Sequence, residues 1–178
     1  MKETILYTVP GPKDAGTIAQ LHVASWREAY ARMIPPEILA GIDLADRTAR
    51  WQSYLAVPGN PTWLASVDGV AAGFIRAGRL SEPLVEGADG HIYALYVLHR
   101  FYRMGIGRAL LARVATQWRE ADGHALSLGV LTANHPARAF YEALGARLVT
   151  DDSYEWDGHL LPESIYVFEN LAELACFA

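Results

Sequence analysis

Cysteine and long hydrophobic runs are almost absent from the 178-residue chain. Its single cysteine, Cys176, excludes an intrachain disulfide framework and fits a reducing compartment. No apolar run approaches the ~18 residues that a membrane-spanning helix needs, and Pro10 and Pro12 interrupt the N-terminal segment before the apolar core of a signal peptide could form. The sequence therefore predicts a soluble, cytoplasmic protein with no membrane partner.

Positive charge is also scarce. The chain carries 15 Lys and Arg against 20 Asp and Glu, which gives a formal net charge of −5 and a pI of about 5.6. It has no run of basic residues, and its only lysines are Lys2 and Lys13. Because nucleic acids and anionic membranes are bound by basic patches, we expect neither as the principal partner.

What the chain does contain is enough apolar sequence for one sizeable core. Hydrophobic residues make up 52% of it, and the mean hydropathy is +0.08. No internal repeat, low-complexity segment or linker divides the sequence. Residues 1–178 are therefore predicted to form a single domain.

Strand and helix patterns follow one another in a mixed order. Alternating or continuously apolar segments bounded by turn residues predict strands at about 4–9, 62–67, 70–78, 91–98, 125–131, 147–156 and 164–169. Apolar residues at i+3 and i+4 spacing predict helices at about 14–32, 37–55, 106–123 and 136–145.

The stretch FYRMGIGRALL, residues 101–111, places two glycines between a predicted strand and a predicted helix. A helix N-terminus with exposed N–H groups attracts anions, and glycines let the backbone approach a phosphate closely. Arg103 and Arg108 would add positive charge there. The alternative is a tight strand-to-helix turn without a ligand.

Two familiar phosphate-binding motifs do not match this stretch. A dinucleotide fingerprint needs a third glycine where the chain has Leu110, and an acidic residue about 20 positions further on where the chain reads LSLGVLT. A P-loop needs a lysine after its second glycine. Neither motif explains the glycines.

The segments LYVLHRFYRMGIGRALL and LTANHPARAFYEALGARLV, taken in this order, resemble the GCN5-related N-acetyltransferases. These enzymes transfer acetyl from acetyl-CoA to an amine. The resemblance implies an α/β fold with a central, twisted, mixed sheet of about six to seven strands flanked by helices. It also implies a splay between the two central parallel strands.

The same resemblance assigns cofactor contacts. The main chain of a strand would pair with the pantetheine arm of acetyl-CoA, the backbone N–H groups of the glycine loop would hold its pyrophosphate, and the loop before the next helix would touch it. The residues implied are Leu95, Tyr96 and Val97, then Arg103, Met104, Gly105, Ile106, Gly107 and Arg108, and finally Asn134. One departure is Tyr102, which stands where the family usually has Gln or Arg.

Tyr141 occupies the position of the family's general acid. An amine attacks a thioester as the free base, and neutralising a lysine-like amine of pKa ~10.4 at pH 7 costs roughly 4 to 5 kcal/mol. The resulting tetrahedral oxyanion needs a hydrogen-bond donor, for which the N–H of Val97 is suited. The leaving thiolate needs a proton, which a tyrosine hydroxyl of pKa ~10 can donate at pH 7. The alternative for Tyr141 is a half-buried aromatic residue at the edge of the stripe formed by Ala137, Phe140 and Leu144.

His91 is the candidate general base, because it stands where some family members have a Glu on the strand before the glycine loop. Histidine has a suitable pKa near 6.5. Tyr93 and ordered water are alternatives for the proton, and a merely hydrogen-bonded histidine is another. The remaining histidines show no metal-ligand spacing, so we expect no metal.

The acceptor is predicted to be an amine-bearing small molecule or peptide that the sequence does not name. Trp26 and Tyr30 could form a wall of its pocket and Glu28 could meet a cation, although an aromatic stripe at helical spacing usually packs in a core. The sequence leaves open whether the chain forms a homodimer. Two other functions compete with an acetyltransferase: a catalytically silent acyl-CoA-binding or sensor domain, and a nucleotide-binding domain of another kind.

Overall fold

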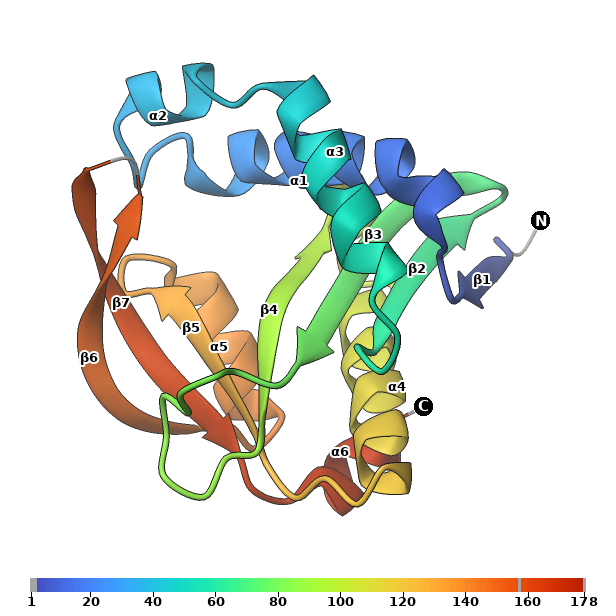
Figure 1. Ribbon diagram of the computed structural model, residues 1–178, viewed down its shortest axis with the longest axis vertical. Coiled ribbons are helices and arrows are strands. Elements are labelled where there is room, and N and C mark those ends of the chain that lie inside the picture. Colours follow the sequence, from blue (N-terminus) through green and yellow to red (C-terminus); the bar gives the residue numbers. More distant parts are fainter. Residues whose placement is uncertain (1–2, 157, 178) are drawn as a thin grey trace.

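The computed structural model describes residues 3–156 and 158–177. Seven strands form one sheet in the order β1-β2-β3-β4-β5-β7-β6 (Figure 1). Their bounds are β1 Ile5–Thr8, β2 Thr62–Val67, β3 Val70–Gly78, β4 Gly90–Val97, β5 Leu126–Leu131, β6 Arg147–Trp156 and β7 His159–Phe168. Among these strands, only β4 and β5 run parallel, and every other neighbouring pair is antiparallel. The predicted mixed sheet is confirmed.

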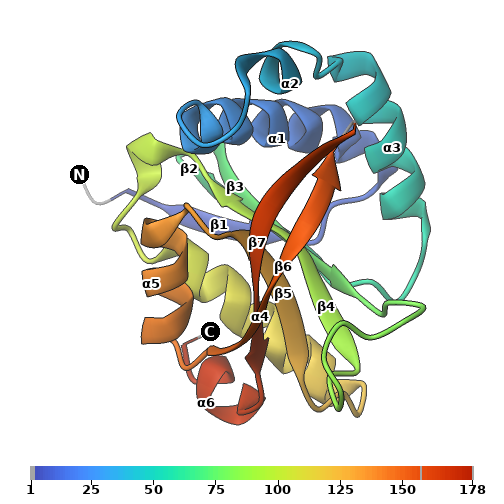
Figure 2. The same cartoon turned by 90° about the vertical axis from the view of Figure 1, so that its left-hand side faces the viewer.

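Helices cover both faces of this sheet (Figure 2). One face carries α1 Ala15–Tyr30, α2 Pro36–Ala40 and α3 Leu44–Ala56, and the other carries α4 Ile106–Glu120, α5 His135–Ala143 and α6 Leu171–Ala175. Short 3-10 helices, η1 Pro12–Asp14 and η2 His99–Phe101, precede α1 and follow β4.

Strand alternation divides the core between the two layers. Phe74 of β3 packs with α1 and α3, whereas the next residue, Ile75, packs with α4 on the opposite face. Both side chains are 0% exposed. Because successive strand residues point to opposite faces, a strand buried on both sides reads as a continuous apolar run, as VAAGFIRAG does.

The two parallel strands separate soon after they meet. β4 and β5 pair only at Gly90 with Leu126, His91 with Ser127 and Ile92 with Leu128. On its other edge, β4 pairs with β3 through a bulge at Tyr93, since Arg76 is opposite Ala94 and Ala77 is opposite Ile92. A bulge bends a strand and increases its twist. Beyond it β4 turns away from β5, which confirms the predicted splay (Figure 1).

Three elements differ from the sequence prediction. The helical region 37–55 is two helices, because the chain turns after Gly41 and restarts at Asp43, whose Oδ1 accepts a hydrogen bond of 2.7 Å from Asp46 N. β7 begins at His159 rather than at 164, since its first half pairs with β6 in a long hairpin. The helix α6 was not predicted.

Candidate active site

The glycine loop presents a row of free backbone donors. Gly105 is the N-cap of α4 in the left-handed conformation, with φ 79°, and Arg103 is also left-handed, with φ 64°. The first hydrogen bond of the helix runs from Ala109 N to Gly105 O, at 3.0 Å. None of the N–H groups of residues 103–108 donates to an acceptor in the described part of the chain. Such a row, at the positive end of a helix dipole, can bind an anion.

The two glycines of this loop are required, or tolerated, for different structural reasons. A Cβ at Gly107 would lie 3.2 Å from Cζ of Phe140, so this glycine lets α5 pack against α4. A Cβ at Gly105 would have only Arg108 Nη2 near it, at 4.0 Å. The open side of the loop is therefore at Gly105, and Arg103 and Arg108 are exposed beside it.

Glu28 fixes the loop to α1. Its Oε2 accepts a hydrogen bond of 2.8 Å from His99 N, at the start of η2, and lies 4.0 Å from His99 Nδ1. Glu28, considered above as a partner for a cation, thus already accepts a hydrogen bond from the main chain of η2. Tyr102, which ends this segment, packs its ring against His99 at 4.7 Å and is half-exposed.

The edge of β4 that faces the splay is open. Beyond Tyr93, β4 pairs with β3 but not with β5. Leu95, Tyr96 and Val97 therefore have main-chain groups along this edge that no neighbouring strand uses. A strand edge with free N–H and C=O groups can pair with an extended amide-bearing chain.

Tyr141 lies on α5 and is deeper than its predicted place at the edge of an apolar stripe. It is the buried residue of this helix, with its ring edge-on to Phe140 and to Phe168 at 5.4 and 6.4 Å. Its hydroxyl makes no hydrogen bond to the described residues. Burial, followed by the charges of Tyr30 and Tyr102, raises its pKa, so the hydroxyl is protonated at neutral pH. Asn134 caps the same helix: its Oδ1 accepts from Ala137 N at 3.3 Å.

His91 lies where β4 and β5 are still paired. Its Nδ1 is 2.9 Å from Oγ of Ser127, and that hydroxyl donates to Gly90 O at 3.1 Å. Because Ser127 has one proton to donate, its oxygen accepts from Nδ1–H of His91, which leaves Nε2 unprotonated. Burial lowers the pKa of His91 to about 4. The histidine is therefore neutral and a weak base.

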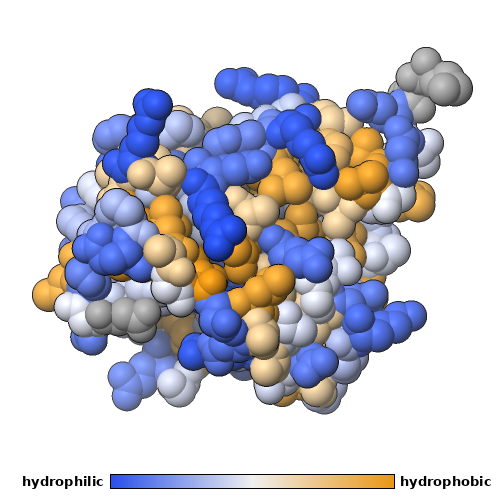
Figure 3. All heavy atoms as spheres, turned by 90° about the horizontal axis from the view of Figure 1, so that it is seen from above, coloured by the Kyte–Doolittle hydropathy of each residue, from blue (hydrophilic) through white to orange (hydrophobic). Residues whose placement is uncertain are grey.

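Trp26 and Tyr30 belong to an aromatic cluster that also includes Tyr96 and Trp156. The hydroxyls of Tyr30 and Tyr96 are 3.3 Å apart, and the rings of Trp26 and Trp156 are 4.5 Å apart. The cluster brings together α1, β4 and the tip of the β6–β7 hairpin, next to the splay. Figure 3 views the molecule from the face that carries α1, α2 and α3. Hydrophobic side chains are visible there among hydrophilic ones, in the direction of this hairpin.

His22 of α1 contacts the aromatic cluster through Trp26 and Tyr96. Its ring stacks on Tyr96 at 5.2 Å, and its Nδ1 accepts a hydrogen bond of 3.1 Å from Trp51 Nε1. Burial, helped by the charge of Arg47, lowers the pKa of His22 to about 3. It is a neutral core residue at physiological pH.

Glu163 is a residue that the sequence analysis missed. It lies on β7, and its carboxylate covers Gly129 of β5 so closely that a Cβ at this position would collide with it. The signal that was present is Gly129 itself, because a glycine inside a buried strand often marks a close approach by another group.

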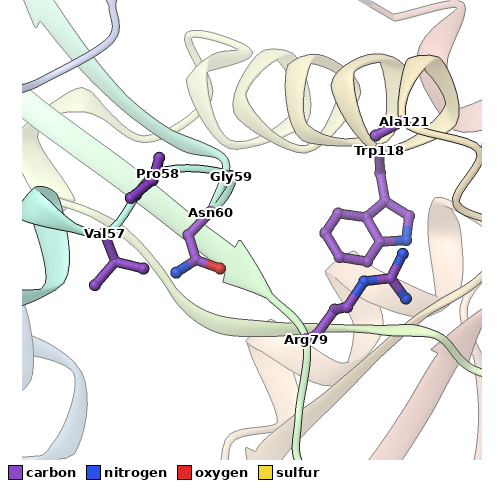
Figure 4. Close-up of a pocket in the computed structure, with 7 residues that line it drawn as sticks. All are labelled: Val57, Pro58, Gly59, Asn60, Arg79, Trp118 and Ala121. Carbon is purple, nitrogen blue, oxygen red and sulfur yellow. The ribbon is translucent and has the colours of Figure 1, made fainter.

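Two surface hollows lie away from the glycine loop and the splay. One, of about 260 Å³, sits at the C-terminal end of α4, the end opposite the glycine loop, and includes Asn60, Arg79 and Trp118 (Figure 4). The other, of about 320 Å³, lies between α3 and β6 and reaches Trp156 from outside. Neither contains a residue of the glycine loop or the splay.

No group of three potential metal ligands occurs among residues 3–156 and 158–177. In the same described ranges, no helix is long and apolar enough to cross a membrane.

Comparisons with known proteins agree on one family. Residues 18–146 match the acetyltransferase (GNAT) family. YuaI of Bacillus subtilis, named an uncharacterized N-acetyltransferase, is 32% identical over 152 residues, which cover 85% of each chain. Ribosomal-protein-alanine N-acetyltransferase from Brucella melitensis shares the fold with a TM-score of 0.72 and 20% identity, over 92% of this chain and 99% of that one. The yncA protein from Salmonella typhimurium, a putative acetyltransferase solved with acetyl-CoA, gives a TM-score of 0.68 and 18% identity, over 95% of this chain and 94% of that one.

Proposed function

Because the chain belongs to the acetyltransferase (GNAT) family, we propose that it transfers the acetyl group of acetyl-CoA to a primary amine of a small molecule or peptide. The observation that carries this proposal is the row of free N–H groups at the start of α4, directly after the strand whose other edge is open. A pyrophosphate and an amide-bearing arm in one molecule fit these two features. The yncA protein, which shares this fold and was solved with acetyl-CoA as its cofactor, supports the same choice.

The cofactor contacts follow from this arrangement. The N–H groups from Arg103 to Arg108 hold the pyrophosphate, with Gly105 leaving the approach open. The main chain of residues 95–97 pairs with the pantetheine arm. Asn134 uses its Oδ1 for the helix cap, so its amide NH₂ is the group left for the cofactor.

The chemistry that we propose is direct transfer. The neutral amine attacks the thioester carbon, and the N–H of Val97 stabilises the oxyanion of the tetrahedral intermediate. When the C–S bond breaks, Tyr141 donates its proton to the thiolate. The nitrogen loses two protons in all: one before attack, and one that restores the Tyr141 hydroxyl. One proton is released to solvent for each acetyl group transferred.

Two measurements test this function together. Acetyl-CoA should raise the melting temperature of the protein in a dose-dependent way, since a ligand that binds only the folded state stabilises it, whereas NAD and ATP should not. Mixing the protein with acetyl-CoA and a panel of primary amines should release CoA thiol. Binding without thiol release for any amine would indicate a silent acyl-CoA-binding domain, and stabilisation by NAD or ATP alone would indicate another nucleotide-binding function.

A further inference from the structure

The carboxylate of Glu163 lies where the two parallel strands part. Gly129, which it covers, directly follows Leu128, the last β5 residue that pairs with β4. Two residues further on, Leu131 is the cross-strand partner of Glu163. Gly129 and Leu131 share one face of β5 because the strand period is two, and Leu131 packs against the cluster that contains Tyr30. Glu163 is therefore on the aromatic-cluster side of the splay.

No side chain of the described residues neutralises this carboxylate. It makes no ion pair and no hydrogen bond with them. The charged and titratable groups around it are Asp152, opposite it on β6, Tyr30 on α1 and Tyr96, which is hydrogen-bonded to Tyr30, on β4; the covering strand β5 contributes none. Burial, followed by the charge of Asp152, raises the pKa of Glu163. A half-buried carboxylate without a cation is costly unless a ligand supplies one.

We propose that Glu163 binds the ammonium group of the acceptor amine between the aromatic cluster and the splay, and takes a proton from it. This inference rests on the acetyltransferase function proposed above. The carboxylate attracts the cation, and the faces of the aromatic cluster stabilise it further. One N–H bond of the ammonium breaks and an O–H bond forms on Glu163. The freed electron pair attacks the thioester carbon, and Glu163 later releases its proton to solvent.

His91, the base predicted from the sequence, is less well placed for this step. It pairs with Ser127, which precedes Gly129 by two residues on β5, so it lies about 7 Å further from the opening along the strand. Its Nδ1 is also engaged with Ser127. Glu163 is the group that faces both the opening and the aromatic residues.

Three substitutions separate the charge of Glu163 from its position. Glu163→Gln keeps the shape and removes the charge. Gly129→Ala keeps the charge and displaces the carboxylate, which can move because it ends a flexible side chain. Asp152→Asn is the matched control: it removes a neighbouring carboxylate of the same strand pair and leaves Glu163 in place.

The assay is thiol release at saturating acetyl-CoA with 2-phenylethylamine, phenylalanine and a peptide with a free N-terminal alanine, continued with the best of these. Glu163→Gln should lower kcat/KM for the amine by about 10²- to 10⁴-fold, and Gly129→Ala by at least about 10-fold, with acetyl-CoA affinity unchanged. Asp152→Asn should keep kcat within about threefold and move the acidic limb of the pH profile to lower pH, because Asp152 holds the pKa of Glu163 up.

Wild-type kcat/KM in Glu163→Gln would overturn this role while leaving the acetyltransferase proposal intact, and a loss confined to a matched His91→Gln variant would return the base to His91. If Glu163→Gln does not fold, Gly129→Ala decides, and its normal activity would refute the proposal. Acetyl-CoA binding by the wild type with no thiol release for any amine would refute both the role and the function.

Discussion

Replacing Tyr141 with Phe tests the proposed proton donor with the smallest change the chain allows. The substitution removes one hydroxyl and keeps the ring contacts with Phe140 and Phe168. Since this hydroxyl has no hydrogen-bond partner among the described residues, folding should lose almost nothing. We expect the free energy of unfolding to change by less than about 0.5 kcal/mol, or about 2 °C in melting temperature.

The expected effect is on catalysis. A lost general acid typically lowers the rate by about 10- to 10³-fold, which corresponds to about 1.4 to 4 kcal/mol in the barrier. Burial raises the pKa of Tyr141 because a phenolate would be poorly solvated there. The same surroundings destabilise a thiolate leaving group, whose thiol has a pKa of about 8.5 in water. Both anions are therefore disfavoured, so we expect Tyr141 to give its proton to sulfur as its oxygen takes the second proton from the nitrogen, which avoids forming either anion in full.

The assay compares the steady-state kinetics of the wild type and of Tyr141→Phe with two thioesters. With acetyl-CoA, Tyr141→Phe should lower kcat and leave acetyl-CoA affinity near that of the wild type. With a thioester of a more acidic thiol the loss should shrink, because a better leaving group needs less protonation. Tyr7→Phe, a half-buried tyrosine of β1 at the far edge of the sheet, is the control and should keep the wild-type rate. A normal kcat in Tyr141→Phe, or an equal loss with both thioesters, would refute the reasoning.

Two further predictions concern the glycine loop and the buried histidine. Gly105→Ala should cost about 1 kcal/mol of stability, because alanine is strained at φ 79°, and should weaken acetyl-CoA binding by calorimetry; unchanged affinity would contradict the loop assignment. The folded-state pKa of His22 is about 3 against 6.5 for the free side chain, so the unfolded chain takes up a proton first as the pH falls. Stability from this residue is full above about pH 6.5, lost progressively toward pH 3, and reduced by about 2 kcal/mol at pH 5. Urea unfolding at both ends of this window should show that loss for the wild type and a smaller one for His22→Gln; equal slopes would contradict it.

Local patterns predicted most of the fold, and part of the site. The alternating segments and the glycine-bounded helices gave the strands and helices in order, because each signal lies within one element. The break between α2 and α3 was missed, since Gly41 ends a helix only weakly and the next cap, at Asp43, follows at once. Both glycines of the loop were assigned to anion binding, because a sequence does not show that Phe140 packs on Gly107.

Long-range contacts explain what the sequence analysis missed at the site. Glu163 directly precedes the strand predicted at 164–169, and only the long β6–β7 hairpin places it over β5. The same hairpin brings Trp156 to Trp26. Tyr141 was predicted on its helix, but its depth depends on Phe168 from another strand. Such placements follow from register and packing between distant segments, which local periodicity does not encode.

The short pairing of β4 with β5 also bears on how the molecule holds together. Within the described residues, three residue pairs are the only sheet contacts that join β1–β4 to β5, β7 and β6. The sheet thus has a seam, along which one half can open without breaking the ladders inside either half. A pantetheine arm bound in the splay would bridge part of this seam. Amide hydrogen exchange along β5 would then slow when the coenzyme site is occupied. The bound coenzyme would hold the two halves of the sheet together and make their unfolding more cooperative.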